Sequence, residues 1–177
     1  MKSRIENFFI NSAKVLIDPD TLFKEKEDGQ KDYEGIVSLI FYVAILGLLI
    51  GMETQSAVIT ILLILVSIIG LMVFKLIHCG LTYLFAMIFK GKGKFSTLYN
   101  LMCYEYVTAI ILIIGMGLFA ATGKFFILIP ILLLEFLMKT IITVSAVNNV
   151  YKFGYGKSFL SAYGILILIG IVVGLLL

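Results

Sequence analysis

Long apolar segments separated by short polar breaks dominate the chain from residue 36 onward. A helix needs about 20 mostly apolar residues to cross the hydrocarbon core of a bilayer. A backbone surrounded by lipid must satisfy its hydrogen bonds internally, which favours helices over open strands. The pattern therefore predicts an all-α, polytopic membrane domain over residues 36–177. About five transmembrane helices are expected, at residues 36–52, 57–77 with an extension to 89, 98–122, 125–147 and 159–177.

The composition agrees with a lipid environment. Of 177 residues, 61% are hydrophobic and 14% are charged, whereas about a quarter of a soluble domain is charged. A water-soluble fold of this size has too little interior to bury so much apolar surface. The chain also lacks a basic stripe interleaved with exposed aromatics, so nucleic acid is not expected as a partner.

Residues 1–35 differ from the rest, because they hold eight of the eleven acidic residues. Apolar residues in this segment recur at helical spacing, at Ile5, Phe8, Phe9, Ala13 and Leu16. This spacing predicts an amphipathic helix at the membrane surface, with packing against the helical bundle as the alternative. Asp18 and Pro19 suit the end of this helix and the start of a second one, which Gly29 would end. The segment is expected to be cytoplasmic.

Basic residues predict the orientation. Eleven of the fourteen lie in residues 1–35, in the break after the second apolar segment and in the break after the fourth. The break after the third has only Lys124. Because cytoplasmic loops carry an excess of Lys and Arg, the N-terminus is expected inside and the C-terminus outside. The expected location is the cytoplasmic cell membrane, with multiple passes.

Five ionisable residues fall within the apolar segments or at their edges: Lys75, His78, Glu105, Glu135 and Lys139. A charge in hydrocarbon costs roughly 3 kcal/mol on insertion scales, so these residues need partners. Glu135 and Lys139 are spaced to pair on one helix face. We expect one intramembrane polar cluster, which serves either a proton, ion or ligand path or a structural network. In the structural alternative, Lys75 and His78 extend to the inner interface.

No catalytic or cofactor signature is evident. A single histidine argues against a multi-histidine zinc site, and Cys79 and Cys103 fit packed free thiols. No nucleophile and base can be assembled together. The sequence therefore predicts a non-enzymatic protein without cofactor or metal.

Two pairs of glycines have the spacing that lets helix backbones approach closely, Gly47 with Gly51 and Gly170 with Gly174. Such pairs serve either packing within one chain or dimerisation, so a homo-oligomer remains an alternative.

Three short motifs resemble the YIP family, the Ypt/Rab-interacting membrane proteins. They are Asp18-Pro19 with Leu22-Phe23, the turn from Gly91 to Phe95, and the connection from Tyr151 to Phe159. The resemblance implies five spans, a cytoplasmic N-terminus and an exported C-terminus. The eukaryotic branch binds prenylated Rab GTPases in vesicle traffic. This chain lacks the Asp-Leu-Tyr-Gly-Pro motif of that branch and resembles a minimal prokaryotic member.

The leading hypothesis is a membrane scaffold or interaction protein that takes part in membrane trafficking or organisation. Its cytoplasmic face would engage lipid headgroups or a protein partner. The face would comprise Asp18, Pro19, Phe23, Lys90, Lys92, Lys94, Tyr151, Lys152, Tyr155 and Lys157. The alternative is a small proton- or ion-coupled transporter or channel that uses the Glu/Lys cluster.

Overall fold

The computed structural model describes residues 4–27 and 33–176, and these residues form helices and short connections without a strand. The α-helices and 3-10 helices (η) are α1 Arg4–Ile17, α2 Pro19–Glu27, α3 Glu34–Met52, α4 Ala57–Ile88, α5 Phe95–Cys103, η1 Tyr104–Thr108, α6 Ala109–Thr122, η2 Phe125–Ile127, α7 Leu128–Tyr151 and α8 Tyr155–Leu176.

Five helical segments are long and apolar enough to cross a membrane: Glu34–Met52, Ala57–Ile88, Phe95–Thr122, Phe125–Tyr151 and Tyr155–Leu175. The predicted all-α fold with five candidate spans is therefore confirmed. The third segment consists of α5, η1 and α6 in continuous succession. The orientation of the two termini across the membrane stays a prediction.

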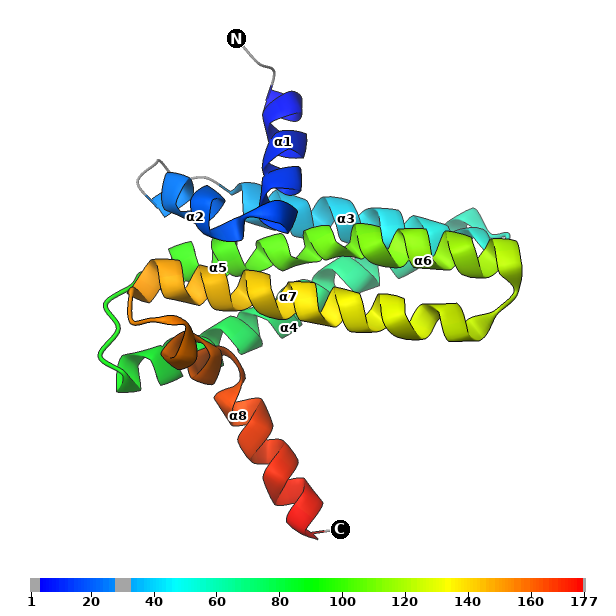
Figure 1. Cartoon of the computed structure of the whole chain (residues 1–177). Helices are drawn as coiled ribbons and strands as arrows, with labels where there is room; N and C mark the ends of the chain where they lie inside the picture. The colour runs from blue at the N-terminus through cyan, green and yellow to red at the C-terminus, as the bar shows by residue number, and fades with distance from the viewer. Residues whose placement is uncertain (1–3, 28–32, 177) are drawn as a thin grey trace.

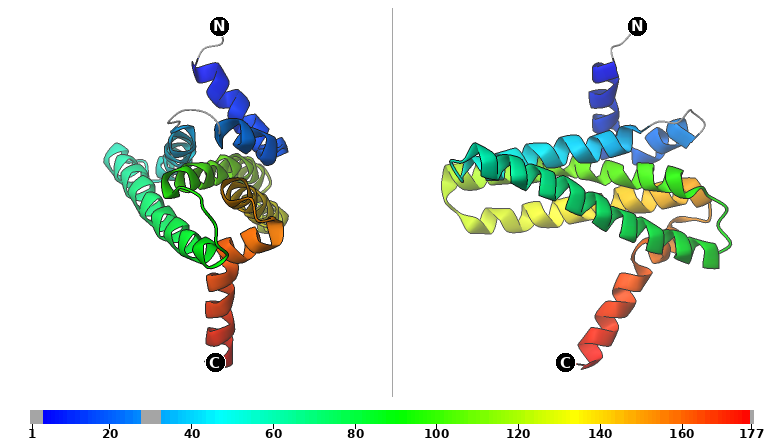
Figure 2. Two further views of the ribbon diagram at one scale, coloured as in Figure 1. Left: turned by 90° about the vertical axis from the view of Figure 1, so that its left-hand side faces the viewer. Right: turned by 180° about the vertical axis from the view of Figure 1, so that it is seen from behind.

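Helices α3, α4, α6 and α7 run along a common direction and form an elongated bundle (Figure 1). At one end lie α2, the α4–α5 connection and the α7–α8 connection, and we call this the α2 end. The opposite end holds the α3–α4 and α6–α7 connections. Helices α1 and α8 project from the bundle on different sides (Figure 2).

The break between α1 and α2 follows from Asp18. Its carboxylate accepts hydrogen bonds from the Thr21 amide at 3.2 Å and the Thr21 hydroxyl at 2.6 Å. This is the predicted capping of the second helix, and Pro19 occupies the first helical position, where no amide donor is needed. The predicted end at Gly29 lies outside the described residues.

Helix α1 packs partly against the bundle, as the alternative arrangement expected, and its place at a membrane surface stays a prediction. Ser12 and Val15 are buried, and Phe8 packs edge-on against Phe41 of α3. Phe9 is half exposed but also packs edge-on against Phe41, and Ile5 is exposed. The bundle thus contacts α1 from Phe8 onward, while Ile5 near its start faces outward.

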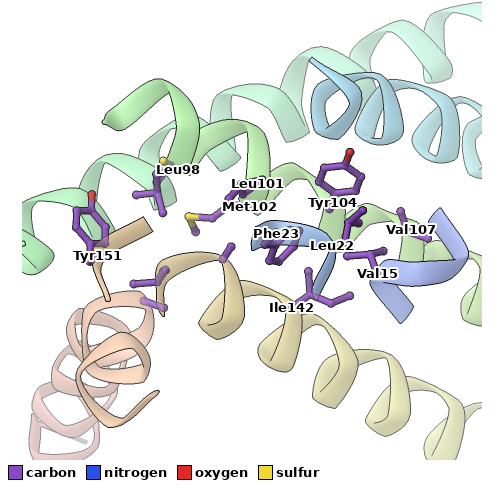
Figure 3. Packing of buried hydrophobic residues seen from close by; sticks show 14 of the residues in the cluster. Val15, Leu22, Phe23, Leu98, Leu101, Met102, Tyr104, Val107, Ile142 and Tyr151 are labelled. Atoms are coloured by element: carbon purple, nitrogen blue, oxygen red, sulfur yellow. The ribbon is translucent and has the colours of Figure 1, made fainter. Parts of the chain in front are cut away.

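The main hydrophobic core lies toward the α2 end, where the N-terminal helices insert between α5–η1 and α7 (Figure 3). Leu22 and Phe23 of α2 are fully buried, and the Phe23 ring lies 5.8 Å from that of Tyr104. Leu98, Met102 and Ile142 complete this packing. Burying an aromatic side chain contributes on the order of 2–3 kcal/mol, so α2 is an integral part of the core.

Glycines allow two helix contacts. A Cβ atom on Gly35 would lie 1.8 Å from the Asn100 carbonyl oxygen, so α3 and α5 meet backbone to backbone. A Cβ atom on Gly51 would lie 2.5 Å from Thr60 of α4. The first glycine pair therefore packs within the chain. A Cβ atom placed on Gly170 or Gly174 would have no neighbour within 4 Å outside its own helix backbone. The second half of α8 projects away from the other helices (Figure 1).

Candidate functional site

The intramembrane cluster begins with an ion pair between two spans. Lys75 of α4 is fully buried, and its ammonium lies 2.6 Å from the Glu105 carboxylate of η1. The Thr143 hydroxyl of α7 donates a second contact to Glu105 at 2.5 Å. These three residues join three different spans, since each comes from a separate transmembrane segment.

Thr108 extends the cluster toward a second pair. Its hydroxyl contacts the Glu105 carbonyl oxygen at 2.7 Å and the Glu135 carboxylate at 3.3 Å. Glu135 pairs with Lys139 one turn further along α7. The Lys139 ammonium also lies 5.6 Å from the centre of the Tyr106 ring, within the range of a cation–π contact.

Lys75 is fully buried and does not extend outward as the structural alternative expected, whereas the position of the partly buried His78 relative to the interface stays a prediction. Lys75 turns inward because Glu105 offers a buried countercharge. His78 Nε2 lies 2.9 Å from the Ala162 carbonyl oxygen of α8. The structure thus pairs Lys75 with Glu105 and Lys139 with Glu135, Thr108 lies between the two pairs, and His78 is one helical turn from Lys75.

The cluster coincides with an irregular stretch of the third span. η1 is a 3-10 helix whose five residues are all buried, and a 3-10 stretch within a longer helix often marks a hinge or strain. The two Lys and two Glu are formally neutral together, which reduces the penalty for charges in hydrocarbon. The arrangement can fix helix register.

At the α2 end, one carboxylate joins α2 to two spans. Asp20 accepts hydrogen bonds from Ser145 at 2.5 Å and from Asn149 at 2.9 Å, both on α7. The Tyr155 hydroxyl of α8 donates to the same carboxylate at 2.5 Å. Hydrogen bonds to a charged acceptor are worth roughly 1.5–3 kcal/mol, so this junction holds α2 firmly in place.

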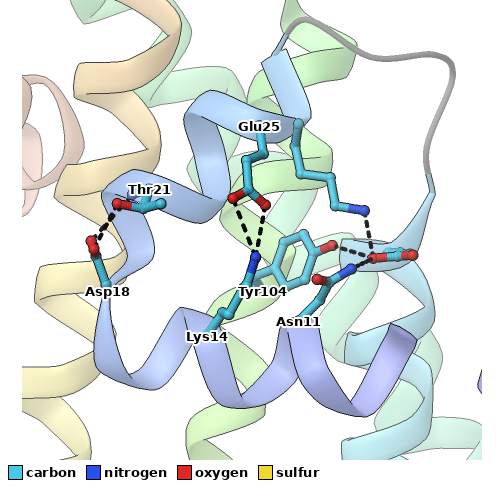
Figure 4. Close-up of polar contacts among 8 residues, drawn as sticks. Asn11, Lys14, Asp18, Thr21, Glu25 and Tyr104 are labelled. Atoms are coloured by element: carbon cyan, nitrogen blue, oxygen red, sulfur yellow. Dashed lines mark hydrogen bonds and ion pairs between the residues drawn. The ribbon is translucent and has the colours of Figure 1, made fainter. Parts of the chain in front are cut away.

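A second carboxylate joins α1, α2 and α3 (Figure 4). Glu34 accepts hydrogen bonds from Asn11 at 2.7 Å, Lys26 at 2.7 Å and the Tyr104 hydroxyl at 3.0 Å. Lys14 and Glu25 form an additional, more exposed ion pair between α1 and α2 at 2.9 Å. The N-terminal helices are therefore fixed to the bundle by polar contacts as well as by the core.

The predicted cytoplasmic face divides into exposed and buried members. The exposed ones are Asp18, Tyr155, Lys90, Lys92, Lys94, Lys152 and Lys157, and Pro19 is half-buried. Phe23 is fully buried and Tyr151 is 8% exposed, so neither is available to a partner. Both side chains pack inside the protein: Phe23 contacts Tyr104, and Tyr151 lies against Gly91 and Gly93.

Among the described residues outside the spans, Asp18 has a shifted pKa. The hydrogen bonds from Thr21 hold the pKa of its carboxyl below the ordinary value of 3.8. Asp18 therefore keeps its negative charge at the start of α2, where the helix dipole favours an anion.

No group of three or more His, Cys, Asp or Glu side chains within residues 4–27 and 33–176 is arranged to hold a metal ion. Cys79 and Cys103 are free and buried.

The sequence has a recognisable family likeness over nearly its whole length. The model of the Yip1 domain matches residues 13–177, which include every candidate span. The chain belongs to the Yip1 family. It is accordingly a multi-pass membrane protein of that family, which is not known as an enzyme family. Comparison with curated proteins and with solved structures finds no match.

Several residues that organise this Yip1-family protein were not among the predicted site residues. Thr108 lies between the two ion pairs, Thr143 binds Glu105, and Asp20 anchors α2. A signal for Asp20 was present in the sequence. The polar residues Ser145, Asn148 and Asn149 stand at the end of an apolar segment, and such polar side chains require a polar partner when they are buried. The threonines give no comparable signal, since threonine is common in apolar helices.

Proposed function

We propose that this Yip1-family protein is a non-enzymatic scaffold of the cell membrane. The α2 end would face the cytoplasm and present a fixed surface to lipid headgroups or to a protein partner. The observation that carries this proposal is the anchoring of α2, with Leu22 and Phe23 fully buried and Asp20 bound to α7 and α8. A preorganised surface binds with less loss of conformational entropy than a flexible segment.

Charge distribution supports the same assignment. The exposed lysines of the two connections at the α2 end contrast with the single Lys124 between α6 and α7. This asymmetry is what the positive-inside rule expects of a cytoplasmic face. The buried charges of the spans are arranged in opposite-sign pairs, which suits a network that fixes helix positions.

Cysteine labelling tests the orientation. The native Cys79 and Cys103 are buried, so a cysteine that replaces Lys92 or Lys124 would be the exposed thiol of its variant. A membrane-impermeant maleimide should label Lys124→Cys and leave Lys92→Cys unlabelled until the membrane is opened. The reverse result would place the α2 end outside and remove the cytoplasmic scaffold.

Site-specific photocrosslinking tests the interaction itself. A photoreactive residue at Lys92 or Lys157 should yield discrete protein or lipid adducts in the native membrane. The same residue at Lys124, at the opposite end, should not yield the same adducts. Identical adducts at all three positions would indicate non-specific collisions and contradict a defined interaction surface.

The second candidate is a proton- or ion-coupled transporter, and the buried chain from Lys75 through Glu105 and Thr108 to Glu135 favours it. Proteoliposomes holding the full chain and a pH-sensitive dye distinguish the two functions. A scaffold should conduct no more than empty liposomes. If the wild type conducts protons and a correctly folded Glu105→Gln variant does not, the transporter function would be favoured and the scaffold function rejected.

A further inference from the structure

Five lysines gather where two connections meet at the α2 end. Lys90, Lys92 and Lys94 lie between α4 and α5, and Lys152 and Lys157 lie at the α7–α8 connection. All five side chains are exposed. We call this set, Lys90, Lys92, Lys94, Lys152 and Lys157, the lysine patch.

Close packing holds the two connections together. A Cβ atom on Gly91 would lie 2.5 Å from the Tyr151 ring, and one on Gly93 would lie 2.2 Å from Val150. The rings of Phe89 and Phe153 lie 6.0 Å apart. The lysines are therefore attached to one packed unit, and their charges are concentrated on the same part of the surface.

Two of these lysines occupy unfavourable backbone positions. Among the described residues, three that are not glycine have a positive φ, and two of them are Lys90 at 63° and Lys152 at 54°. They follow the last turns of α4 and α7, where glycine or asparagine is usual. Because glycine would adopt this backbone with less strain, a lysine at these two positions suggests that its side chain has a function.

The two chain segments that carry the patch contain no opposite charge of their own. Neither residues 84–99 nor residues 150–163 contain Asp or Glu. The ion pairs found in the described part of the chain involve Lys14, Lys26, Lys75 and Lys139, and none involves Lys90, Lys92, Lys94 or Lys157. Asp20 borders the patch through Tyr155, but its carboxylate already accepts three hydrogen bonds.

Exposed apolar side chains flank the patch along the chain. Helices α4 and α8 pack against each other, and near the patch they expose Leu84 and Ile88 on one helix and Phe159 and Leu160 on the other. Exposed lysines next to exposed apolar side chains match a molecule with an anionic head and acyl chains.

We propose that the lysine patch binds a phospholipid whose headgroup carries at least two phosphate charges. The proposal deepens the scaffold function, since it names a headgroup as one occupant of the interaction surface. Four of its cations, Lys90, Lys92, Lys94 and Lys157, take part in none of the ion pairs of the described residues. Such a group suits a polyanionic headgroup, because one phosphate would leave most of that charge without a counterion. The acyl chains would lie along α4 and α8.

Native mass spectrometry of the full-length protein in detergent tests this with defined lipids. Cardiolipin, with two phosphates, should bind more tightly than phosphatidylglycerol, with one. The variant Lys90→Gly/Lys157→Gln should weaken cardiolipin binding by roughly 25-fold, taking about fivefold for each lysine. Lys90 has a positive φ, which glycine adopts freely, and Lys157 is exposed, so the thermal midpoint of this variant should not fall. The control Lys124→Gly, at the opposite end, should bind as the wild type does.

The outcomes separate the sources of the anion. Equal affinity for the two lipids, or unchanged cardiolipin binding by the double variant, would overturn the proposal. Inorganic pyrophosphate that binds as tightly as cardiolipin would assign the patch to a soluble anion and overturn the lipid assignment. None of these results changes the crosslinking or flux tests of the scaffold, so the two proposals fail separately.

Discussion

The two ends of the bundle are built in different ways. At the α2 end, Leu22, Phe23 and Leu98 are fully buried, and carboxylates tie α1 and α2 to the spans. At the opposite end, the α3–α4 turn exposes Glu53, and the α6–α7 connection leaves Phe126 65% exposed. Side chains at the α2 end are thus buried by other parts of the chain, whereas these side chains at the opposite end are exposed.

The difference shows where a membrane protein can keep a fixed surface. Lipid tails are as apolar as leucine, so there is no hydrophobic force between helices inside the bilayer. Helices at the opposite end rely on small-residue contacts such as Gly51 with Thr60. The α2 end adds a core of its own and a set of charge-assisted hydrogen bonds. A surface that binds a partner is therefore expected at the α2 end, where the packing is more extensive.

The strongest test of this contrast compares two phenylalanines. Phe23→Ala removes a fully buried ring from the core beneath α2 and should destabilise the protein by about 3–5 kcal/mol. Phe126→Ala removes an exposed ring at the opposite end and should change stability by less than about 0.5 kcal/mol. Unfolding in detergent, followed by circular dichroism, measures both. Equal effects of the two substitutions would contradict the contrast between the ends.

The buried pair in the middle of the bundle should give the next largest effect. Lys75→Met leaves Glu105 without its countercharge, and breaking a buried pair destabilises by about 3 kcal/mol or more. The double variant Lys75→Met/Glu105→Leu removes both charges and should recover most of that loss. A double-mutant cycle on the unfolding free energies gives the coupling. A double variant less stable than either single variant would show that the pair is needed for more than charge balance.

The Asp20 junction should give a smaller effect. Asp20→Asn retains the shape but removes the charge that strengthens the bonds from Ser145 and Tyr155, so a loss of about 1–2 kcal/mol is expected. Glu53→Gln at the opposite end makes the same chemical change at an exposed position and should be nearly neutral. Protease sensitivity at the start of the chain, compared between the variants, also reports release of α2. Resistance equal to that of the wild type would show that the core alone holds α2.

The spans and the pairing of their charges could be predicted because lipid imposes strict conditions. A long apolar segment must be helical, and a charge such as Glu105 or Glu135 must find a countercharge. Both conditions act on the sequence itself, and both are met by Lys75 with Glu105 and by Lys139 with Glu135. The Yip1 family match extends over the same residues.

The burial of α2 could not be predicted because its partners are remote in the sequence. Phe23 lies within a strongly charged segment and looked like a surface residue, yet it packs against Tyr104. Asp20 binds Asn149, which lies 129 positions later. The 3-10 stretch at Glu105 likewise has no local signal, since no proline or glycine occurs between Tyr104 and Thr108.

The smallest expected effect concerns the cap of α2 and its pH dependence. The folded pKa of Asp18 is lowered by the hydrogen bonds from Thr21, so its contribution to stability is present above the unfolded pKa of about 4. That contribution is lost as the pH falls through the folded value. Asp18→Ala should therefore lower the thermal midpoint slightly at neutral pH, and the difference from the wild type should vanish in acid. Thr21→Val removes the hydroxyl donor and should show the same pH trend with a smaller amplitude. A difference that persists unchanged in strong acid would mean that the Asp18 charge does not contribute through this cap.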